Sequence, residues 1–296
     1  MKTVKLFALA VMGLAAIAAC SRDTDYSAVG GMEISIRASI GEISKVATTG
    51  NKAEFENGDQ VALYAWTGSA TAVSSLLVVN GVKNTLGTDG KWTPETQMLW
   101  ADMVTPHYFI GIHPARTVTS FTADKFTLDP ADYKASDLLI AKNVAGLVAQ
   151  KAPVALTFNH AMALLKVNLA FRDQWSTPPT VTAISATARK EGNVDYLKDN
   201  AVTASGMATE VALAKIENAS WSGLQVPQSG VSVITIKIEG KDYVFTNTED
   251  IPLAGGRITT VNLNVGRDKI DLASPLTISD WVTGETIENG EAQTED

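Results

Sequence analysis

Val154-Ala-Leu-Thr-Phe-Asn-His-Ala-Met-Ala-Leu-Leu-Lys-Val-Asn-Leu-Ala-Phe171 is the stretch that decides the fold. Its first part places Val154, Leu156 and Phe158 on one face, which is the two-residue period of a strand with one buried side. Around residues 159–161 the phase shifts by one, and the apolar residues from Ala163 onward take over the buried face. A bulge or kink would produce such a shift. The stretch therefore predicts a long central strand with its own bend.

Shorter strands are predicted on both sides of this stretch. Residues 32–40 alternate apolar and polar side chains, as do residues 61–66. Asn80-Gly81, Asp89-Gly90 and Glu239-Gly240 are turn signals between such runs. Helical periodicity is almost absent, so the predicted fold class is all-β.

Residues 130–147 remain ambiguous from the pattern alone. Asp129-Pro130 could begin a short helix, yet Leu138 to Ala141 is also a buried apolar run of strand length.

Chain length and proline content predict two domains. Removing 19 N-terminal residues from 296 leaves 277, enough for about two domains of ordinary size. Pro178-Pro179 excludes regular strand pairing, so residues 172–180 are the predicted linker. The first domain would span 32–171 and the second 181–283, followed by an acidic tail at 284–296. The net charge of -8 argues against a nucleic-acid partner.

The N-terminus has the features of a lipoprotein leader. Lys2 and Lys5 precede an apolar run at 6–19, and Ile17-Ala-Ala-Cys20 has the form of a lipobox. Residues 1–19 are therefore predicted to be a signal peptide and not a membrane span. Cys20 would carry the lipid, and residues 20–31 would form a polar tether. As the sole cysteine, Cys20 leaves the mature chain no disulfide and no thiol nucleophile.

No catalytic motif stands out. There is no nucleophile elbow, P-loop or His-Glu-x-x-His sequence. His107 and His113 would lie roughly 20 Å apart on one strand, too far for a shared metal, and His160 beside a bulge fits a structural role better than a ligand role. No carboxylate pair is singled out by spacing. We therefore expect no enzyme activity, no cofactor and no metal.

Six tryptophans raise a carbohydrate-binding alternative. Most should lie in the core or at a domain seam. Trp92 and Trp175 are flanked by polar and turn residues, so they are the candidates for exposed glycan contacts. In this alternative the chain is a surface lipoprotein that binds glycans without polymerising.

The pattern Val-x-Leu-x-Phe-x-His-x-Met-Ala-x-Leu-x-Val at 154–167 resembles the signature strand of the fimbrillin family, pilin-like lipoproteins of Bacteroides-type bacteria. Three further pieces match this family in the same order: Phe55 to Tyr64, Ser136 to Ala141, and Ile278 to Trp281. The resemblance implies two transthyretin-like β-sandwich domains in tandem. It favours a strand over a helix at 130–147. It also implies an outer membrane lipoprotein at the cell surface and a role as shaft, tip or anchor subunit of a fimbria.

In fimbrillins, an arginine-specific protease removes the first strand, and the C-terminal strand of a neighbouring subunit fills the groove. Carried over, residues 32–40 would be displaced, and the donor would lie within 273–287. Its candidate plugs are Leu276, Ile278, Trp281 and Val282, although Asp280 interrupts their alternation. The implied partners are other fimbrial subunits, the outer membrane through the lipid anchor, and host or bacterial surface ligands.

The expected cleavage site departs from the family pattern. The loop before Phe55 offers Lys45 and Lys52 where the family would have an arginine. Arg37, within the predicted first strand, is the remaining candidate for proteolytic maturation. Its other interpretation is an ordinary solvent-facing strand residue.

Overall fold

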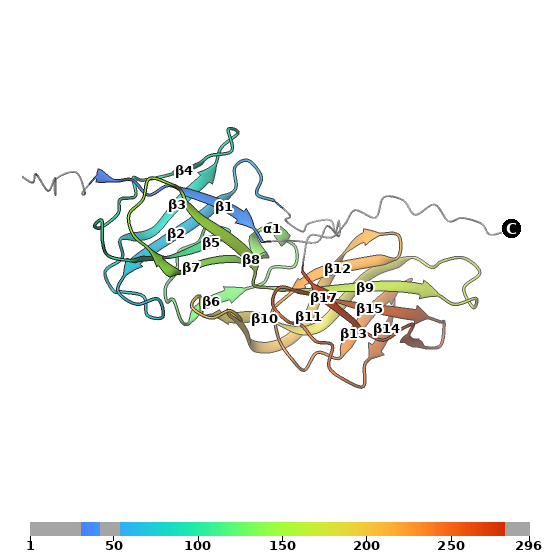
Figure 1. The fold of residues 1–296 in the computed structure, drawn as a ribbon. Coiled ribbons are helices and arrows are strands. Elements are labelled where there is room, and N and C mark those ends of the chain that lie inside the picture. Colours follow the sequence, from blue (N-terminus) through green and yellow to red (C-terminus); the bar gives the residue numbers. More distant parts are fainter. Residues whose placement is uncertain (1–30, 42–53, 282–296) are drawn as a thin grey trace, which may run out of the picture.

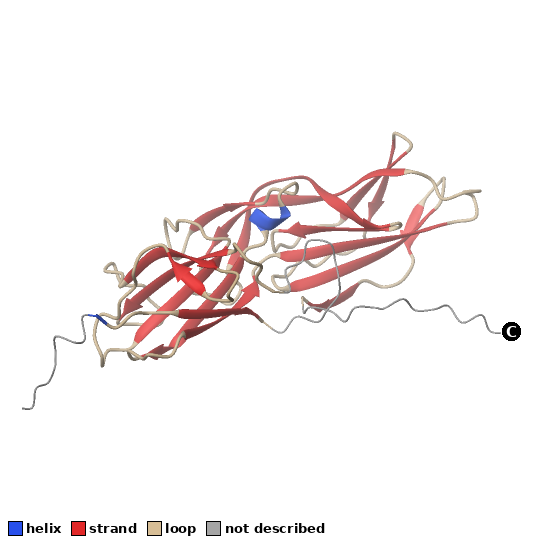
Figure 2. Ribbon diagram, turned by 90° about the horizontal axis from the view of Figure 1, so that it is seen from above, coloured by secondary structure: helices blue, strands red, loops and turns tan. Residues whose placement is uncertain are grey.

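The computed structural model describes residues 31–41 and 54–281. The all-β prediction is confirmed, because strands dominate the described chain (Figure 2). The strands form two sheets, each with a sandwich-like shape, and the sheets make two lobes arranged end to end (Figure 1). Within the described ranges there is one short α-helix, α1 (Tyr133–Ser136). Residues 130–147 thus contain both elements that the pattern allowed, a single helical turn and then a strand.

The first sheet has seven strands and is buried on both faces. Along β2, Leu63 faces one core and Tyr64 the other, as the alternation at 61–66 predicts. The strand order is β1 (Ile36–Ile40), β8 (Val154–His160), β7 (Leu139–Leu147), β5 (His107–His113), β2 (Gln60–Thr67), β3 (Val79–Leu86) and β4 (Trp92–Pro94).

The second sheet has ten strands, eight of them in one path. That path is β14 (Lys241–Thr246), β13 (Val233–Ile238), β10 (Val181–Val194), β11 (Val202–Glu217), β12 (Ser220–Gln225), β9 (Ala163–Phe171), β15 (Arg257–Val265) and β16 (Ile270–Leu272). Two strands lie off it: β17 (Thr277–Asp280) pairs with β15, and β6 (Asp124–Thr127) pairs with β10.

The prediction of a single bent strand at 154–171 is wrong. The stretch forms two strands in different sheets, because β8 pairs with β1 and β7 whereas β9 pairs with β12 and β15. The phase shift marks the place where the chain crosses between sheets. A phase shift in the apolar alternation is compatible with a crossing between sheets as well as with a bulge, because both rotate the chain relative to the neighbouring strands.

The predicted linker at 172–180 does not separate the sheets. The strands before and after it, β9 and β10, both belong to the ten-stranded sheet, and the chain changes sheet at 161–162 instead. The earlier segment β6 also joins this sheet. Pro178-Pro179 does interrupt pairing, but the interruption is a loop inside the second lobe.

Asn80-Gly81 is not the predicted turn. Gly81 lies inside β3 with φ +66, where the register against β2 shifts between Leu63 and Tyr64. A side chain at position 81 would meet the Tyr64 hydroxyl at 2.8 Å. Glycine is therefore required here by a bulge, a feature that shares its sequence signature with turns.

Candidate assembly interface

The first described strand, β1, occupies the edge of the seven-stranded sheet. It runs parallel to β8 in register from Ile36 opposite Val154 to Ile40 opposite Phe158. Just before it, the amide of Ile34 donates to the carbonyl of Met98 at 2.8 Å. Within the described residues β8 is the only strand that pairs with β1. Residues 32–40 thus form the predicted opening segment of a sheet, with residues 32–34 bonded to 98–100 and residues 36–40 paired with β8.

Two apolar side chains anchor this segment in the core. Ile34 and Ile36 are buried, the latter only 6 % exposed, and they pack with Leu156 and Phe158. The intervening Glu33, Ser35, Arg37 and Ser39 are exposed. Burying two isoleucines contributes about 3–6 kcal/mol. The segment therefore fills an apolar groove beside β8, the strand with which it pairs.

Arg37 is exposed and lies opposite Ala155 in the parallel ladder. Its backbone is part of β1, so a protease could reach this bond only after the strand had opened locally. Cleavage at Arg37 stays a prediction. Cys20 and Val282 lie outside the described residues.

The C-terminal strand β17 contributes little to its own lobe. All four of its residues are exposed, with Ile278 at 55 %, and Leu276 just before it is half-buried. Its attachment is the backbone ladder to β15 and an ion pair between Arg257 and Asp280. Such a strand buries few apolar atoms where it sits.

Trp281 differs from the other candidate donor residues. It is 5 % exposed, and its indole stacks on the His160 ring at a centroid distance of 4.0 Å and an angle of 5°. The amide of Trp281 donates to the carbonyl of Gly256 at 2.8 Å. In this structure Trp281 therefore ties the C-terminal segment to the end of β8.

His160 is held by a buried carboxylate. Its Nδ1 lies 2.8 Å from Oδ1 of Asp137, and both side chains are almost fully buried. Asp137 closes α1 by donating its amide to the carbonyl of Tyr133. The structural role expected for His160 matches this pairing. Asp137 was not singled out from sequence, although it stands in the Ser-Asp-Leu-Leu-Ile piece that carries the family resemblance.

All six tryptophans are buried or half-buried. Trp92, predicted to be exposed, is only 9 % exposed and packs edge-on against Phe55. The predicted exposure of Trp92 is wrong because β4 turns this side chain toward the core. The polar residues that flank Trp92 in the sequence do not indicate this tertiary contact. Trp175 is half-buried, donates to the Val265 carbonyl at 3.1 Å, and carries the Arg267 guanidinium over its ring at 5.0 Å.

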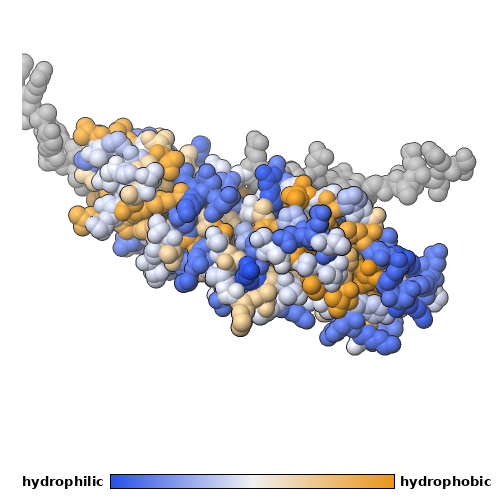
Figure 3. Space-filling model, turned by 90° about the horizontal axis from the view of Figure 1, so that it is seen from below, coloured by the Kyte–Doolittle hydropathy of each residue, from blue (hydrophilic) through white to orange (hydrophobic). Residues whose placement is uncertain are grey.

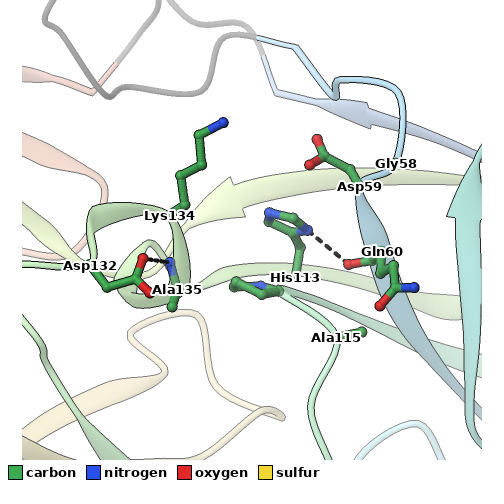
Figure 4. Close-up of a pocket in the computed structure, with 9 residues that line it drawn as sticks. Gly58, Asp59, Gln60, His113, Ala115, Asp132, Lys134 and Ala135 are labelled. Atoms are coloured by element: carbon green, nitrogen blue, oxygen red, sulfur yellow. Dashed lines mark hydrogen bonds between the residues drawn. The ribbon is translucent and has the colours of Figure 1, made fainter.

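A depression of about 310 Å³ lies between the start of β2, the end of β5 and α1 (Figure 4). Its polar side chains serve local structure. His113 Nδ1 lies 2.9 Å from the Gln60 carbonyl, and Asp132 accepts the Ala135 amide as the helix cap. Asp59 accepts the Glu56 amide, and Lys134 pairs with Glu56 at the surface. Each of these polar side chains therefore has a structural partner.

A second depression, of about 390 Å³, lies where the two sheets meet, beside Asn159 and Gly256. Its charged groups are matched in pairs: Lys142 Nζ lies 2.8 Å from Asp199 Oδ1, and Arg257 pairs with Asp280. The hydrogen bond from Lys142 lowers the pKa of the exposed Asp199 carboxyl. The strand β17 thus lies along one side of this depression.

Within 31–41 and 54–281, no cluster of three or more histidine, cysteine or acidic residues is arranged to hold a metal. Over the same part of the chain, no helix is long and apolar enough to span a membrane.

These features define a class of protein: an all-β, two-lobed chain with one edge segment inserted into a groove and one exposed C-terminal strand. The fimbrillin-like family model matches residues 45–281, most of the chain, and the chain belongs to this family. Family membership supports a role as a fimbrial subunit in a cell-surface appendage. Among curated proteins nothing matches.

Solved structures share the fold. One, described as a candidate cell adhesion protein from Bacteroides ovatus, is 14% identical with a TM-score of 0.65, covering 84% of this chain and 98% of its own. Another, described likewise from Bacteroides uniformis, is 16% identical with a TM-score of 0.60 and the same coverage. A fimbrial assembly protein from Parabacteroides distasonis is 10% identical with a TM-score of 0.51, covering 83% and 99%.

Proposed function

We propose that this chain is a lipid-anchored, non-enzymatic subunit of a surface fimbria that assembles by strand complementation. The observation that carries the proposal is the pair of strands at opposite ends of the sequence. β1 fills an apolar groove from a sheet edge, and β17 is exposed on both faces. A sheet edge with a vacated groove is a template for a strand from another chain.

The groove suits an alternating donor. The segment 32–40 inserts Ile34 and Ile36 two residues apart, and the C-terminal segment offers Leu276 and Ile278 at the same spacing. Exchange would replace one pair of apolar side chains by another of similar size. The replacement therefore costs little apolar burial and adds the burial of Ile278, which is exposed in the single subunit.

Donation by the full predicted segment requires Trp281 to leave His160. Stacking of this tryptophan holds the strand on its own subunit, so it competes with donation. A shorter donor that uses Leu276 and Ile278 alone would leave the stack intact. The two modes differ in the accessibility of Trp281 within the polymer.

Anchoring follows from the leader sequence. A lipid on Cys20 would hold the uncut subunit at the outer membrane, and cleavage at Arg37 would free it from the anchor. Mass spectrometry of the mature termini tests both statements. A first residue of acylated Cys20 supports the anchor, and a start at Ala38 supports maturation. If every chain isolated from sheared fimbriae begins at Cys20, Arg37 is not the cleavage site.

The test of assembly is a sheared-fimbria preparation run unheated in detergent, where strand-complemented polymers give a ladder. Ile278→Asp should abolish the ladder without unfolding the subunit, because this side chain is exposed and touches no core. Met207→Asp is the matched control, since Met207 is also exposed but lies on β11, away from both strands. A ladder that survives Ile278→Asp would exclude β17 as the donor.

A further inference from the structure

One end of the seven-stranded sheet gathers three loops. Thr67 at the end of β2 pairs with His107 at the start of β5, which pairs with Leu147 at the end of β7. Adjacent strands lie about 5 Å apart. The loops at 68–78, 101–106 and 148–153, here called the distal loops, are therefore neighbours at this end.

The distal loops are apolar and almost uncharged. Leu76 is 82 % exposed and Val104 78 %, and Met103 and Val148 are also exposed. The only charged residues in these loops are Asp102 and Lys151, of opposite sign. Apolar residues are visible at this end of the molecule, on the left of Figure 3, whereas the opposite end is mainly hydrophilic. Exposed large apolar side chains gathered at one end mark a contact surface.

The N-terminal tether begins at the same end. β1 runs parallel to β8 and starts beside Val154, the residue that follows one of the distal loops. Four residues before β1, the carbonyl of Met32 accepts the Trp100 amide at 3.1 Å, so Gly31 lies next to the start of the loop at 101–106. From residue 20 to residue 31 is 11 residues, which span at most about 40 Å. A lipid on Cys20 would hold the distal loops within that distance of a bilayer.

From this placement we propose that the distal loops dock on the lipid bilayer surface in the subunit that still carries its N-terminal strand. The proposal rests on the lipid anchor proposed above. Binding at a bilayer interface grows with the apolar area that enters it, and a short tether keeps the local concentration of the surface high. The near absence of charge removes the desolvation cost that acidic or basic loops would meet there.

The surface has a direct test, because the chain has a single cysteine and that residue is the proposed site of the lipid. Leu76→Cys and Val104→Cys each place one free thiol in the distal loops, and Met207→Cys places one on β11 as the exposed control. Each full-length lipidated chain is labelled with a polarity-sensitive fluorophore and reconstituted into phosphatidylethanolamine and phosphatidylglycerol vesicles containing brominated phosphatidylcholine. We expect blue-shifted, bromine-quenched emission at 76 and 104, and neither effect at 207.

Several outcomes overturn the proposal. Chains that float with the vesicles but are not quenched at 76 and 104 leave the anchor intact and exclude docking. A blue shift without bromine quenching means that the loops contact another protein copy and not lipid. Chains that do not float exclude both the anchor and the docking, whereas the fimbrial ladder tests the subunit role separately.

Discussion

At the scale of single residues, a hydrogen-bonded chain that includes one buried carboxylate links the two lobes. Asp124 accepts hydrogen bonds from Tyr196 at 2.8 Å and from the Thr119 hydroxyl at 2.9 Å, and it pairs with Arg116 at 3.2 Å. The Arg116 carbonyl in turn accepts the Tyr64 hydroxyl of β2 at 3.1 Å. Burial raises the pKa of the Tyr196 hydroxyl, so it remains a donor at any ordinary pH. The Asp124 carboxylate and the Tyr64 hydroxyl, both bonded to the 115–124 segment, thus connect the second sheet with β2.

Asp124→Ala should destabilise the chain by about 3 kcal/mol, because it leaves Arg116 and Tyr196 without their shared acceptor. Asp242→Ala is the control, since Asp242 makes an exposed ion pair with Lys237 and should cost about 0–1 kcal/mol. Denaturant unfolding of both variants measures the difference. Equal losses would show that the buried carboxylate has no special role.

Asp102 in the distal loops should titrate unusually low. Its carboxylate accepts the hydroxyl of Thr105 and the amides of Thr105 and Val104, which lowers its pKa to about 2. Because the pKa of Asp102 in the folded chain lies below the ordinary value of 3.8, the stabilisation by these loop contacts is fully present above pH 3.8. It is lost as the pH falls through about 2. A carbon-13 titration of the carboxyl group checks this. Thr105→Ala should move the midpoint upward, and a wild-type midpoint near 3.8 would contradict the assignment.

At the scale of elements, the first and last strands of the described chain, β1 and β17, differ in how much of their apolar side chains they bury. Both lie at sheet edges and both are short. β1 presents one face to a core through Ile36, whereas β17 presents Ile278 to solvent. The first strand contributes to the stability of the single subunit, and the last is available for contacts outside it.

This contrast predicts different costs for the same substitution. Ile36→Ala should destabilise the folded chain by about 2–5 kcal/mol, because it leaves a cavity over β8. Ile278→Ala should change stability by no more than about 0.5 kcal/mol. Thermal and urea unfolding of the two variants side by side provide the measurement. A large loss in Ile278→Ala would mean that β17 is already packed against apolar groups.

At the scale of the whole molecule, the lobes share a hydrophobic core. One cluster of buried residues contains Tyr64 and Ile110 from the first sheet together with Val167 and Ile236 from the second. The chain crosses between the sheets three times: from β5 to β6, from β6 back to β7, and at 161–162. The two lobes are therefore interdependent in packing.

Unfolding should accordingly be one cooperative transition. Because the shared core would be exposed if either lobe opened alone, partial unfolding costs apolar burial in both lobes. Tryptophan fluorescence and far-ultraviolet circular dichroism should give coincident denaturation curves. Two resolved transitions would show that the lobes are independent domains.

Local patterns in the sequence determined much of this structure. The alternation at 32–40 and 61–66 predicted which side chains face inward, because a strand has a fixed two-residue period. Glu239-Gly240 was correctly predicted to join two strands, since both residues adopt the positive φ that this hairpin turn needs. The resemblance at 154–167 led to the family that the chain belongs to.

Only the tertiary structure decided which strands are neighbours. The phase shift after Phe158 shows that the chain rotates, but a bulge and a crossing between sheets rotate it alike. Trp92 has polar neighbours in sequence and an apolar neighbour, Phe55, in space. Asp137 meets His160, and His160 meets Trp281, across long separations in the chain. Periodicity depends on a residue and its near neighbours, whereas sheet membership and burial depend on contacts between distant segments, which form only when the whole core closes.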